Sequence, residues 1–282
     1  MQVFTRIGPL REFLNNQRIA GKTIGLVPTM GALHEGHVSL FRRARRDTQV
    51  VVGSIFVNPI QFNNPEDLTK YPKTPEKDLE MMKSAGCDVV FMPEIQEVYP
   101  EKPTLAMDFG PLEVVMEAKF RPGHFNGVAI VVSKLLHYVQ PDHAYFGQKD
   151  LQQFMVIRKL VKDLSFQVRL HCCPVIREAN GLAMSSRNQR LTQEGRAKAS
   201  VLFAALTAAR EIIIAGRPSE TAIDKAKGMI SSVPGVELEY FELADAENLQ
   251  PAEDVQLDRN AALCVAAHVE GVRLIDNVLI FS

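Results

Sequence analysis

Residues 23 to 44 read T-I-G-L-V-P-T-M-G-A-L-H-E-G-H-V-S-L-F-R-R-A, and this stretch decides the fold. Its first part, residues 23–27, is a short apolar run bounded by glycine and proline, which predicts a buried strand. From residue 38 onward the pattern is amphipathic and predicts a helix. A strand, a turn of small residues and a helix N-terminus form an anion site, because unpaired N–H groups and the helix dipole point at one place.

Two histidines lie in this turn. His34 and His37 flank Gly36 and place two imidazoles beside the predicted anion site. Near its reference pKa of about 6.5 an imidazole can donate a hydrogen bond to phosphate in either protonation state. The context therefore favours a nucleotide triphosphate as the ligand over a purely structural hydrogen bond.

Two similar motifs are excluded by spacing. A zinc-protease helix needs its second histidine four positions after the first, where this chain has Val38. Lys22 and Thr23 resemble the tail of a phosphate-binding P-loop, but that motif needs glycine where this chain has Asn16. No G-x-G-x-x-G is present either, which argues against a dinucleotide-dependent dehydrogenase.

Composition places the chain among soluble globular proteins. It has 282 residues, of which 46% are hydrophobic and 23% charged, and this length suffices for one large domain or two ordinary ones. No apolar run approaches the roughly 18 residues of a membrane span, and no apolar leader marks a secretory signal. The four cysteines lack a disulfide-framework spacing, and the net charge of −1 lacks the basic excess of a nucleic-acid binder. We therefore expect a cytoplasmic protein without membrane or nucleic-acid partners.

The first part of the chain alternates strand and helix patterns, which predicts an α/β fold: a Rossmann-like parallel sheet covered by helices on both faces. Ligands of such sheets lie beyond the carboxyl ends of the strands. The expected strands are 23–27, 50–57, 88–91, 143–146 and, as a fifth, 167–172; the expected helices are 40–46, 75–85, 128–139 and 151–164.

The pattern changes past residue 187. A long helical pattern spans 194–216 and a second spans 221–231, followed by strand patterns at 236–243, 262–269 and 273–281. Glu270-Gly271 predicts a hairpin between the last two strands. We expect a Rossmann-like domain over residues 1–176 and a smaller α+β C-terminal domain over residues 177–282.

Three more segments carry polar groups suited to a nucleotide or a small substrate. Residues 146–153 read F-G-Q-K-D-L-Q-Q: Gly147 permits close backbone approach, Lys149 offers a point charge for phosphate, and Asp150 either accepts from ribose hydroxyls or caps the helix. Gln153 lies one turn further on. Residues 184–188, M-S-S-R-N, read as a phosphate clamp or as a polar interdomain loop.

Neutral amides mark the third of these segments. Residues 54–62 read S-I-F-V-N-P-I-Q-F, and Asn58 and Gln61 suit recognition of hydroxyl groups on a small substrate. A turn stabilised at Asn58-Pro59 is the alternative. A further glycine-bearing loop, residues 121–128, contains Arg121 and His124, whose role is left open.

Taken together, these segments resemble those of the pantothenate synthetases, or pantoate–β-alanine ligases, within the HIGH-motif nucleotidyltransferase superfamily. The matching segments occur in the family's order over residues 28–188, and R-L-I-D-N at 273–277 extends the likeness over nearly the whole chain. Any one of these motifs is weak evidence for the family, but five motifs in the family's order are specific to it.

The resemblance implies an AMP-forming acid–amine ligase of pantothenate biosynthesis. ATP and (R)-pantoate would give a pantoyl-adenylate and pyrophosphate, and the amine of β-alanine would then displace AMP. Such chemistry needs no protein nucleophile, so catalysis reduces to positioning and charge stabilisation.

The resemblance also implies roles for single residues. His37, His34 and Lys149 would be catalytic, with His37 the proton donor, and Asn58, Gln61 and Gln153 would bind substrate. The nucleotide would be bound by Met30, Gly31, Ala32, Leu33, His34, Glu35, Gly36, His37, Gly147, Gln148, Lys149, Asp150, Ile176, Met184, Ser185, Ser186 and Arg187.

Magnesium would accompany the ATP, a homodimer is implied, and the C-terminal domain would act as a lid. The metal ligands stay unassigned: Asp78 could act indirectly, but Lys77 beside it replaces an acid of some relatives. Two rivals remain open. One is a nucleotidyltransferase that stops after adenylylating a phosphorylated substrate; the other is a nucleotide-sensing or RNA-binding module without turnover.

Overall fold

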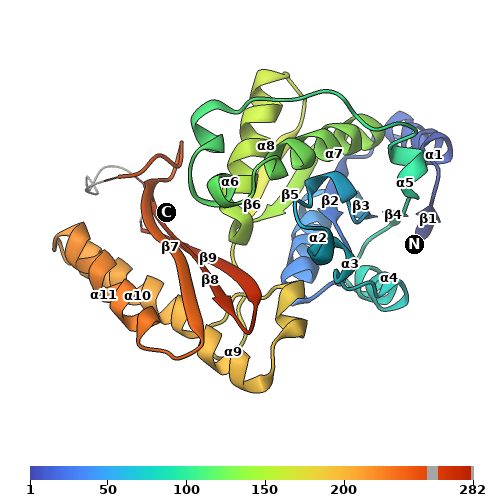
Figure 1. Cartoon of the computed structure of the whole chain (residues 1–282). Helices are drawn as coiled ribbons and strands as arrows, with labels where there is room; N and C mark the ends of the chain where they lie inside the picture. The colour runs from blue at the N-terminus through green and yellow to red at the C-terminus, as the bar shows by residue number, and fades with distance from the viewer. Residues whose placement is uncertain (253–259, 281–282) are drawn as a thin grey trace. The chain divides into compact units, whose positions relative to one another are not determined.

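A computed structural model describes residues 1–252 and 260–280 (Figure 1). The chain divides into two compact units. Unit 1 comprises Met1–Phe109, Arg121–Gly147 and Val156–Pro174, and unit 2 comprises Gly110–Phe120, Gln148–Met155 and Val175–Ser282. By packing, two short segments that precede residue 176 in the sequence thus belong with the C-terminal part. The functional division after residue 176 stays a prediction.

Unit 1 is built on a parallel sheet of six strands in the order β1-β4-β3-β2-β5-β6. The expected Rossmann-like class is confirmed. The sheet consists of β1 (Gln2–Phe4), β2 (Ile24–Thr29), β3 (Val50–Ile55), β4 (Val89–Phe91), β5 (His143–Gly147) and β6 (Arg169–Cys173). The strand order reverses between β2 and β5, so the carboxyl ends of these two strands flank the switch point at which such folds bind ligands.

Helices cover both faces of this sheet. On one face α2 (Glu35–Asp47) and α4 (Pro75–Ser84) pack on alternate strand residues such as Val27 and Val51. On the other, α7 (His124–Val139) places Tyr138 edge-on to Phe91 of β4, with ring centroids 6.0 Å apart. Unit 1 also contains α1 (Ile7–Ile19), α3 (Pro65–Thr69), α5 (Ile95–Val98), the 3₁₀ turn η1 (Pro59–Gln61) and most of α8 (Leu151–Asp163).

β2 runs through the proline that was expected to bound it. The N–H of Phe56 donates to the carbonyl of Thr29, so Thr29 faces β3 and Pro28 faces the opposite side. On that side the last pair with β5 is Leu26 with Ala144. Pro28 therefore lies past the paired segment, where its missing N–H breaks no ladder bond.

A ring cluster lies on the edge strand β6 and its neighbour β5. Nδ1 of His143 lies 2.8 Å from Nε2 of His171, and the His171 ring stacks on Tyr145 with centroids 4.6 Å apart. The Tyr145 hydroxyl donates to Asp47, which Arg43 also contacts. Burial, followed by the neighbouring His143, lowers the pKa of His171, so folding favours the neutral form of the ring.

Unit 2 is the expected smaller α+β part. Its antiparallel sheet, in the order β7-β8-β9, contains β7 (Val236–Asp245), β8 (Ala261–Val269) and β9 (Val272–Leu279). Helices α10 (Val201–Ile214) and α11 (Ser219–Ser231) cover one face with Leu202, Leu206 and Ile230, which belong to one buried cluster. The unit also contains α6 (Met116–Phe120), α9 (Gln193–Ala199) and the 3₁₀ turns η2 (Gly110–Glu113), η3 (Gln148–Asp150) and η4 (Ser186–Arg190).

The single helix expected over 194–216 is wrong, because it divides into α9 and α10 at Ser200. The Ser200 hydroxyl donates to the carbonyl of Ala197 at 2.6 Å, a local bond that competes with the helical ladder. The hairpin at Glu270-Gly271 is confirmed, since Val269 pairs with Val272 across it. The predicted last strand reaches residue 281, which lies outside the described residues. None of the helices in residues 1–252 and 260–280 is long and apolar enough to cross a membrane.

Candidate active site

The turn after β2 is fixed by a buried carboxylate. Asp78, 1% exposed, accepts the backbone N–H groups of Ala32 at 2.9 Å and Leu33 at 2.7 Å, and the hydroxyl of Thr74 at 3.1 Å. The backbone is left-handed at Gly31 (φ 81°) and Ala32 (φ 50°). A Cβ on Gly31 would lie 3.0 Å from a carboxylate oxygen of Asp78, so glycine lets the turn close on that carboxylate.

The two histidines cap α2 reciprocally. His34 is the N-cap residue, and its Nδ1 accepts the N–H of Gly36 at 3.2 Å, while Nδ1 of His37 accepts the N–H of His34 at 3.3 Å. Their ring centroids are 4.1 Å apart. Because both Nδ1 atoms act as acceptors, the proton of each neutral ring lies on Nε2. The capping bonds thus fix the tautomer of both imidazoles.

The expectation that the N–H groups of this turn are unpaired is wrong at six positions. Gly31 donates to the hydroxyl of Thr29 at 3.2 Å, and His37 donates to the carbonyl of His34 at 2.8 Å. Ala32 and Leu33 donate to Asp78, and His34 and Gly36 donate to the two imidazoles. The sequence could not show this, because the acceptors include a carboxylate 45 residues away from Leu33. The two rings add their Nε2–H groups to this turn as side-chain donors.

The predicted amides of unit 1 form a buried chain. Asn58, 1% exposed, donates through Nδ2 to Oε1 of Gln61 at 2.9 Å and to the carbonyl of Gly127 at 3.0 Å. Its Oδ1 accepts the hydroxyl of Tyr99 at 2.9 Å. Gln61 in turn donates through Nε2 to the sulfur of Met30, at 3.1 Å. The side-chain amide of Asn58 therefore bonds to protein groups, and its bond to Oε1 orients the side chain of Gln61.

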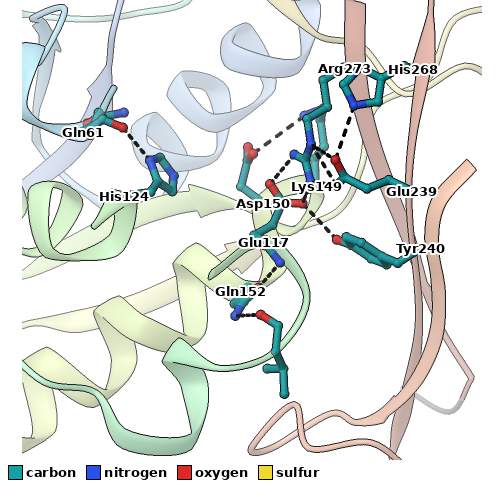
Figure 2. A network of polar contacts seen from close by, with 11 residues as sticks. Gln61, Glu117, His124, Lys149, Asp150, Gln152, Glu239, Tyr240, His268 and Arg273 are labelled. Carbon is teal, nitrogen blue, oxygen red and sulfur yellow. Dashed lines mark hydrogen bonds and ion pairs between the residues drawn. The ribbon is translucent and has the colours of Figure 1, made fainter. Parts of the chain in front are cut away.

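Two further contacts hold the backbone of Gln61. Nδ1 of His124 lies 2.8 Å from its carbonyl oxygen (Figure 2). Gly127 on α7 approaches the same turn so closely that a Cβ there would lie 2.5 Å from the carbonyl oxygen of Ile60. Tyr99, Gly127 and His124 were not predicted in this role. His124 and Gly127 lay in the glycine-bearing loop whose function the sequence left open, whereas Tyr99 carried no signal.

Unit 2 carries the other predicted groups. η3 follows directly after β5 and holds Lys149, whose side chain is 17% exposed and whose Nζ lies 3.7 Å from Oδ1 of Asp150 (Figure 2). Gln152 is 4% exposed and accepts the N–H of Glu117, whereas Gln153 is half-buried. The sequence Q-Q alone did not show that Gln152 has a structural role, whereas Gln153 is the one predicted to bind substrate.

The serine–arginine segment lies at the end of a tight hairpin. The N–H of Met184 donates to the carbonyl of Ile176 at 2.9 Å, and Arg177 bridges to Ala183 across the hairpin. Ser185 then caps η4 by accepting the N–H of Arg187 at 3.3 Å. These bonds give residues 184–187 a defined path, and one serine hydroxyl serves the backbone as a cap.

The structure thus distributes the predicted site residues over two units. Unit 1 holds Met30, Gly31, Ala32, Leu33, His34, Glu35, Gly36, His37, Asn58, Gln61 and Gly147, and unit 2 holds Gln148, Lys149, Asp150, Gln153, Ile176, Met184, Ser185, Ser186 and Arg187. Their ligand contacts stay predictions.

Three of the four cysteines are buried and poorly suited to act as nucleophiles. Burial raises the pKa of Cys87 to about 12, and it also raises the pKa of Cys173 and Cys264, whereas Cys172 is exposed. A thiol reacts as its thiolate, which is scarce near neutral pH at such values. This chemistry agrees with a reaction that proceeds without a covalent protein intermediate.

Comparison with known proteins gives the family. The sequence profile of pantoate-beta-alanine ligase matches residues 2–279. The chain is 47% identical to a pantothenate synthetase of Cytophaga hutchinsonii over 277 residues, which is 98% of each chain. It is also 47% identical to one of Porphyromonas gingivalis over 278 residues, 99% of each chain.

Solved structures agree with these relatives. A pantothenate synthetase from Thermus thermophilus superposes with a TM-score of 0.94 at 41% identity and 100% coverage of both chains. A pantoate-beta-alanine ligase from Francisella tularensis, complexed with beta-gamma ATP and beta-alanine, gives a TM-score of 0.80 at 34% identity, covering 99% of this chain and 98% of the other. The chain belongs to the pantoate–β-alanine ligase family and is an ATP-dependent ligase.

Proposed function

We propose that this ligase joins (R)-pantoate to β-alanine through a pantoyl-adenylate, with phosphate handled by His34, His37 and Lys149. The reciprocal capping of His34 and His37 carries the proposal, because it holds two imidazoles side by side with Nε2 protonated. Two such donors at a helix N-terminus suit the negative charge of a triphosphate.

In the first step a carboxylate oxygen of pantoate attacks the α-phosphorus of ATP. An O–P bond forms, the bond to the bridging oxygen breaks, and pyrophosphate leaves with the electron pair. Charge that develops on the phosphate oxygens is stabilised by the Lys149 ammonium and the Nε2–H groups of His34 and His37. His37, the proposed proton donor of this step, acts through a hydrogen bond from Nε2–H to the departing pyrophosphate. Full proton transfer would need the imidazolium form, in which Nδ1 no longer accepts the N–H of His34.

In the second step the neutral amine of β-alanine attacks the acyl carbon of the adenylate. A C–N bond forms, the C–O bond to AMP breaks, and the amine proton passes to solvent. Gln61 and Gln153 hold the pantoyl hydroxyl groups, and Asn58 acts by orienting Gln61. Positioning of this kind replaces a covalent enzyme intermediate.

Other residues are assigned to the nucleotide. Met30–Leu33, Glu35 and Gly36 line it from the β2 turn; Gly147, Gln148 and Asp150 serve the ribose; Ile176 serves the adenine through its backbone; and Met184–Arg187 clamp the phosphates. We also propose a cytoplasmic homodimer in which the C-terminal domain acts as a lid.

Magnesium fits this scheme as a companion of ATP. Within residues 1–252 and 260–280, groups of three or more histidine, cysteine or acidic side chains that could hold a metal ion are absent. Both Asp78 oxygens already accept N–H groups of the β2 turn, which argues against Asp78 as a ligand. Mg²⁺ commonly takes substrate phosphates and waters as ligands. The ion would neutralise phosphate charge when bound.

Isotope exchange between ATP and pyrophosphate tests the proposal. We expect exchange to require pantoate and Mg²⁺ but not β-alanine. Release of AMP should require both pantoate and β-alanine. Folded protein that shows neither reaction overturns the proposal. Transfer of AMP to a phosphorylated substrate instead would identify a nucleotidyltransferase, and ATP or RNA binding without turnover would identify a sensor or an RNA-binding module.

A further inference from the structure

Strand β9 places a carboxylate and an amide at neighbouring positions near its end. Side chains alternate along a strand, so Asp276 shares the face of Leu274, whereas Asn277 shares the opposite face with Arg273. Both residues are buried, at 4% and 3% exposure. The R-L-I-D-N motif of the sequence ends with this pair, and the reaction scheme above assigns neither residue a role.

Asn277 is bonded to the turn that contains Lys149. Its Nδ2 donates to the carbonyl oxygens of Gln148 and Lys149, both at 2.9 Å. Its Oδ1 accepts Nε2 of Gln148 at 3.1 Å. One side-chain amide thus holds two successive peptide groups of η3, and it fixes the direction in which the Lys149 backbone presents its side chain.

Asp276 is bonded to the hairpin that leads to the serine–arginine segment. It accepts Nη1 of Arg177 at 2.6 Å and Nη2 at 3.0 Å. The same guanidinium donates to the carbonyl of Gly181 at 3.1 Å and stacks on Phe203, 3.7 Å from the ring centroid. Burial raises the pKa of Asp276, and Arg177 opposes that effect. The two faces of β9 therefore anchor two segments with proposed phosphate contacts.

A second anchor ties the same sheet to α6. Arg273 forms a bidentate pair with Glu117, with both N–O distances 2.7 Å, and Tyr240 donates to Glu117 at 2.9 Å (Figure 2). Gln152 on α8 accepts the N–H of Glu117 and donates to the carbonyl of Leu112 at 2.7 Å. The start of α8 is thus held through Glu117 to the strand that carries Asn277.

We propose that Asn277 is a positioning residue for adenylation, which aims the Lys149 ammonium by holding the carbonyls of Gln148 and Lys149. Asp276 performs the matching task for the hairpin through Arg177. The inference rests on the proposed role of Lys149. Asn277 acts on the first half-reaction, because Lys149 stabilises charge on the triphosphate and not on the attacking amine.

The experiment compares Asn277→Leu with wild type, Lys149→Ala and the double variant. Leucine has the branched shape of asparagine, but it removes the Nδ2 donor to both carbonyls and the Oδ1 acceptor for Gln148. We expect the turnover number of pantoate-dependent ATP–pyrophosphate exchange to fall about tenfold, while the KM for pantoate changes by less than about twofold. Pantothenate formation from synthetic pantoyl-adenylate and β-alanine should keep its rate. The double variant should match Lys149→Ala, because the two residues act through one group.

Arg210→Ala is the matched control. Arg210 donates to the carbonyls of Leu279 at 2.9 Å and Ile280 at 3.4 Å, so its loss also weakens the end of β9 but leaves η3 bonded. Thermal unfolding should show both variants destabilised, whereas the tenfold fall in exchange should occur only in Asn277→Leu. Asn277→Ser, with one donor, should give an intermediate rate, and it decides the question if the leucine variant does not fold.

Three outcomes overturn the inference. Equal exchange rates in Asn277→Leu and Arg210→Ala would show that Asn277 has only a structural role. Additive effects of Asn277→Leu and Lys149→Ala in the double variant would show that Asn277 does not act through Lys149. Equal loss of both half-reactions would contradict an effect through phosphate. If wild type lacks pantoate-dependent exchange, the proposed function fails and takes the inference with it; if only the Asn277 variants disagree, the proposed function stands.

Discussion

The carboxylate of Asp78 accepts the backbone N–H of Leu33 at 2.7 Å, and so joins the first turn of α4 to the turn after β2. Its other oxygen accepts Ala32. Asp78→Ala would leave two buried N–H groups without an acceptor, and we expect a loss of about 3 kcal/mol of unfolding free energy. Urea unfolding measures it, with the exposed Glu80→Ala on the same helix as control. An unchanged midpoint would show that the turn holds its shape without Asp78.

His34→Asn separates capping from phosphate contact. Asparagine is a preferred N-cap residue, so we expect the unfolding free energy to change by less than about 1 kcal/mol. The variant lacks the Nε2 donor, and exchange between ATP and pyrophosphate should fall about a hundredfold, as for one lost charge-stabilising donor. His34→Ala should lose both properties. Retained exchange in the asparagine variant would restrict His34 to capping.

Lys149→Ala removes the point charge assigned to the triphosphate. We expect adenylation to slow by about 2–4 kcal/mol of transition-state stabilisation, measured as pantoate-dependent exchange. Lys159→Ala on α8 is the control, since Lys159 pairs with Asp163, four residues on. This variant should catalyse exchange at the normal rate. Normal turnover of Lys149→Ala would remove this residue from the mechanism.

Asn58→Ala tests whether Gln61 is oriented by its neighbour. The variant loses the donor to Gln61 and the acceptor for Tyr99, so the KM for pantoate should rise about tenfold. Tyr99→Phe is the matched comparison, because it leaves both Nδ2 bonds of Asn58 in place. Burial raises the pKa of Tyr99, which keeps its hydroxyl protonated as a donor. Equal KM values in both variants would argue that Gln61 needs no support from Asn58.

The stability of the protein should fall on mild acidification through His171. Its folded-state pKa lies below the ordinary value of 6.5, because burial and His143 disfavour the charged ring while Asp47 partly opposes them. The unfolded chain therefore binds the proton first, and stability present above pH 6.5 is lost as the pH falls through the folded-state pKa. In His171→Gln the urea unfolding midpoint should change less between pH 7 and pH 5 than it does in wild type. His137 is exposed on α7, so His137→Gln should keep the wild-type pH dependence. If the pH dependence of the midpoint is unchanged in His171→Gln, the loss of stability on acidification arises from other groups.

The sequence predicted the structural features that depend on interactions over a few residues. The apolar run before Pro28 became β2, and the histidine pair lies at the start of α2, because burial and helix capping act over a few residues. β1 and α1 were not predicted. β1 has three residues, and α1 buries only Leu10 and Leu14, so neither leaves a clear pattern.

Long-range partners could not be predicted in the same way. Asp78, Tyr99 and Glu117 each satisfy groups tens of residues away, and nothing in their local sequence names those groups. Asp276 and Asn277 lay in a motif that the resemblance quoted, but their bonds to Arg177 and to η3 depend on how β9 packs. Polar residues that orient the reacting groups are therefore the part of the site that only a structure supplies.

Gly127 has a consequence for natural variation in this enzyme. Any missense change in its codon adds at least a methyl group, at 2.5 Å from the Ile60 carbonyl oxygen. Such a contact must displace η1 or α7, and Gln61 belongs to η1. A saturation library selected for growth without pantothenate should therefore tolerate only silent changes at this codon, as if residue 127 itself touched the substrate.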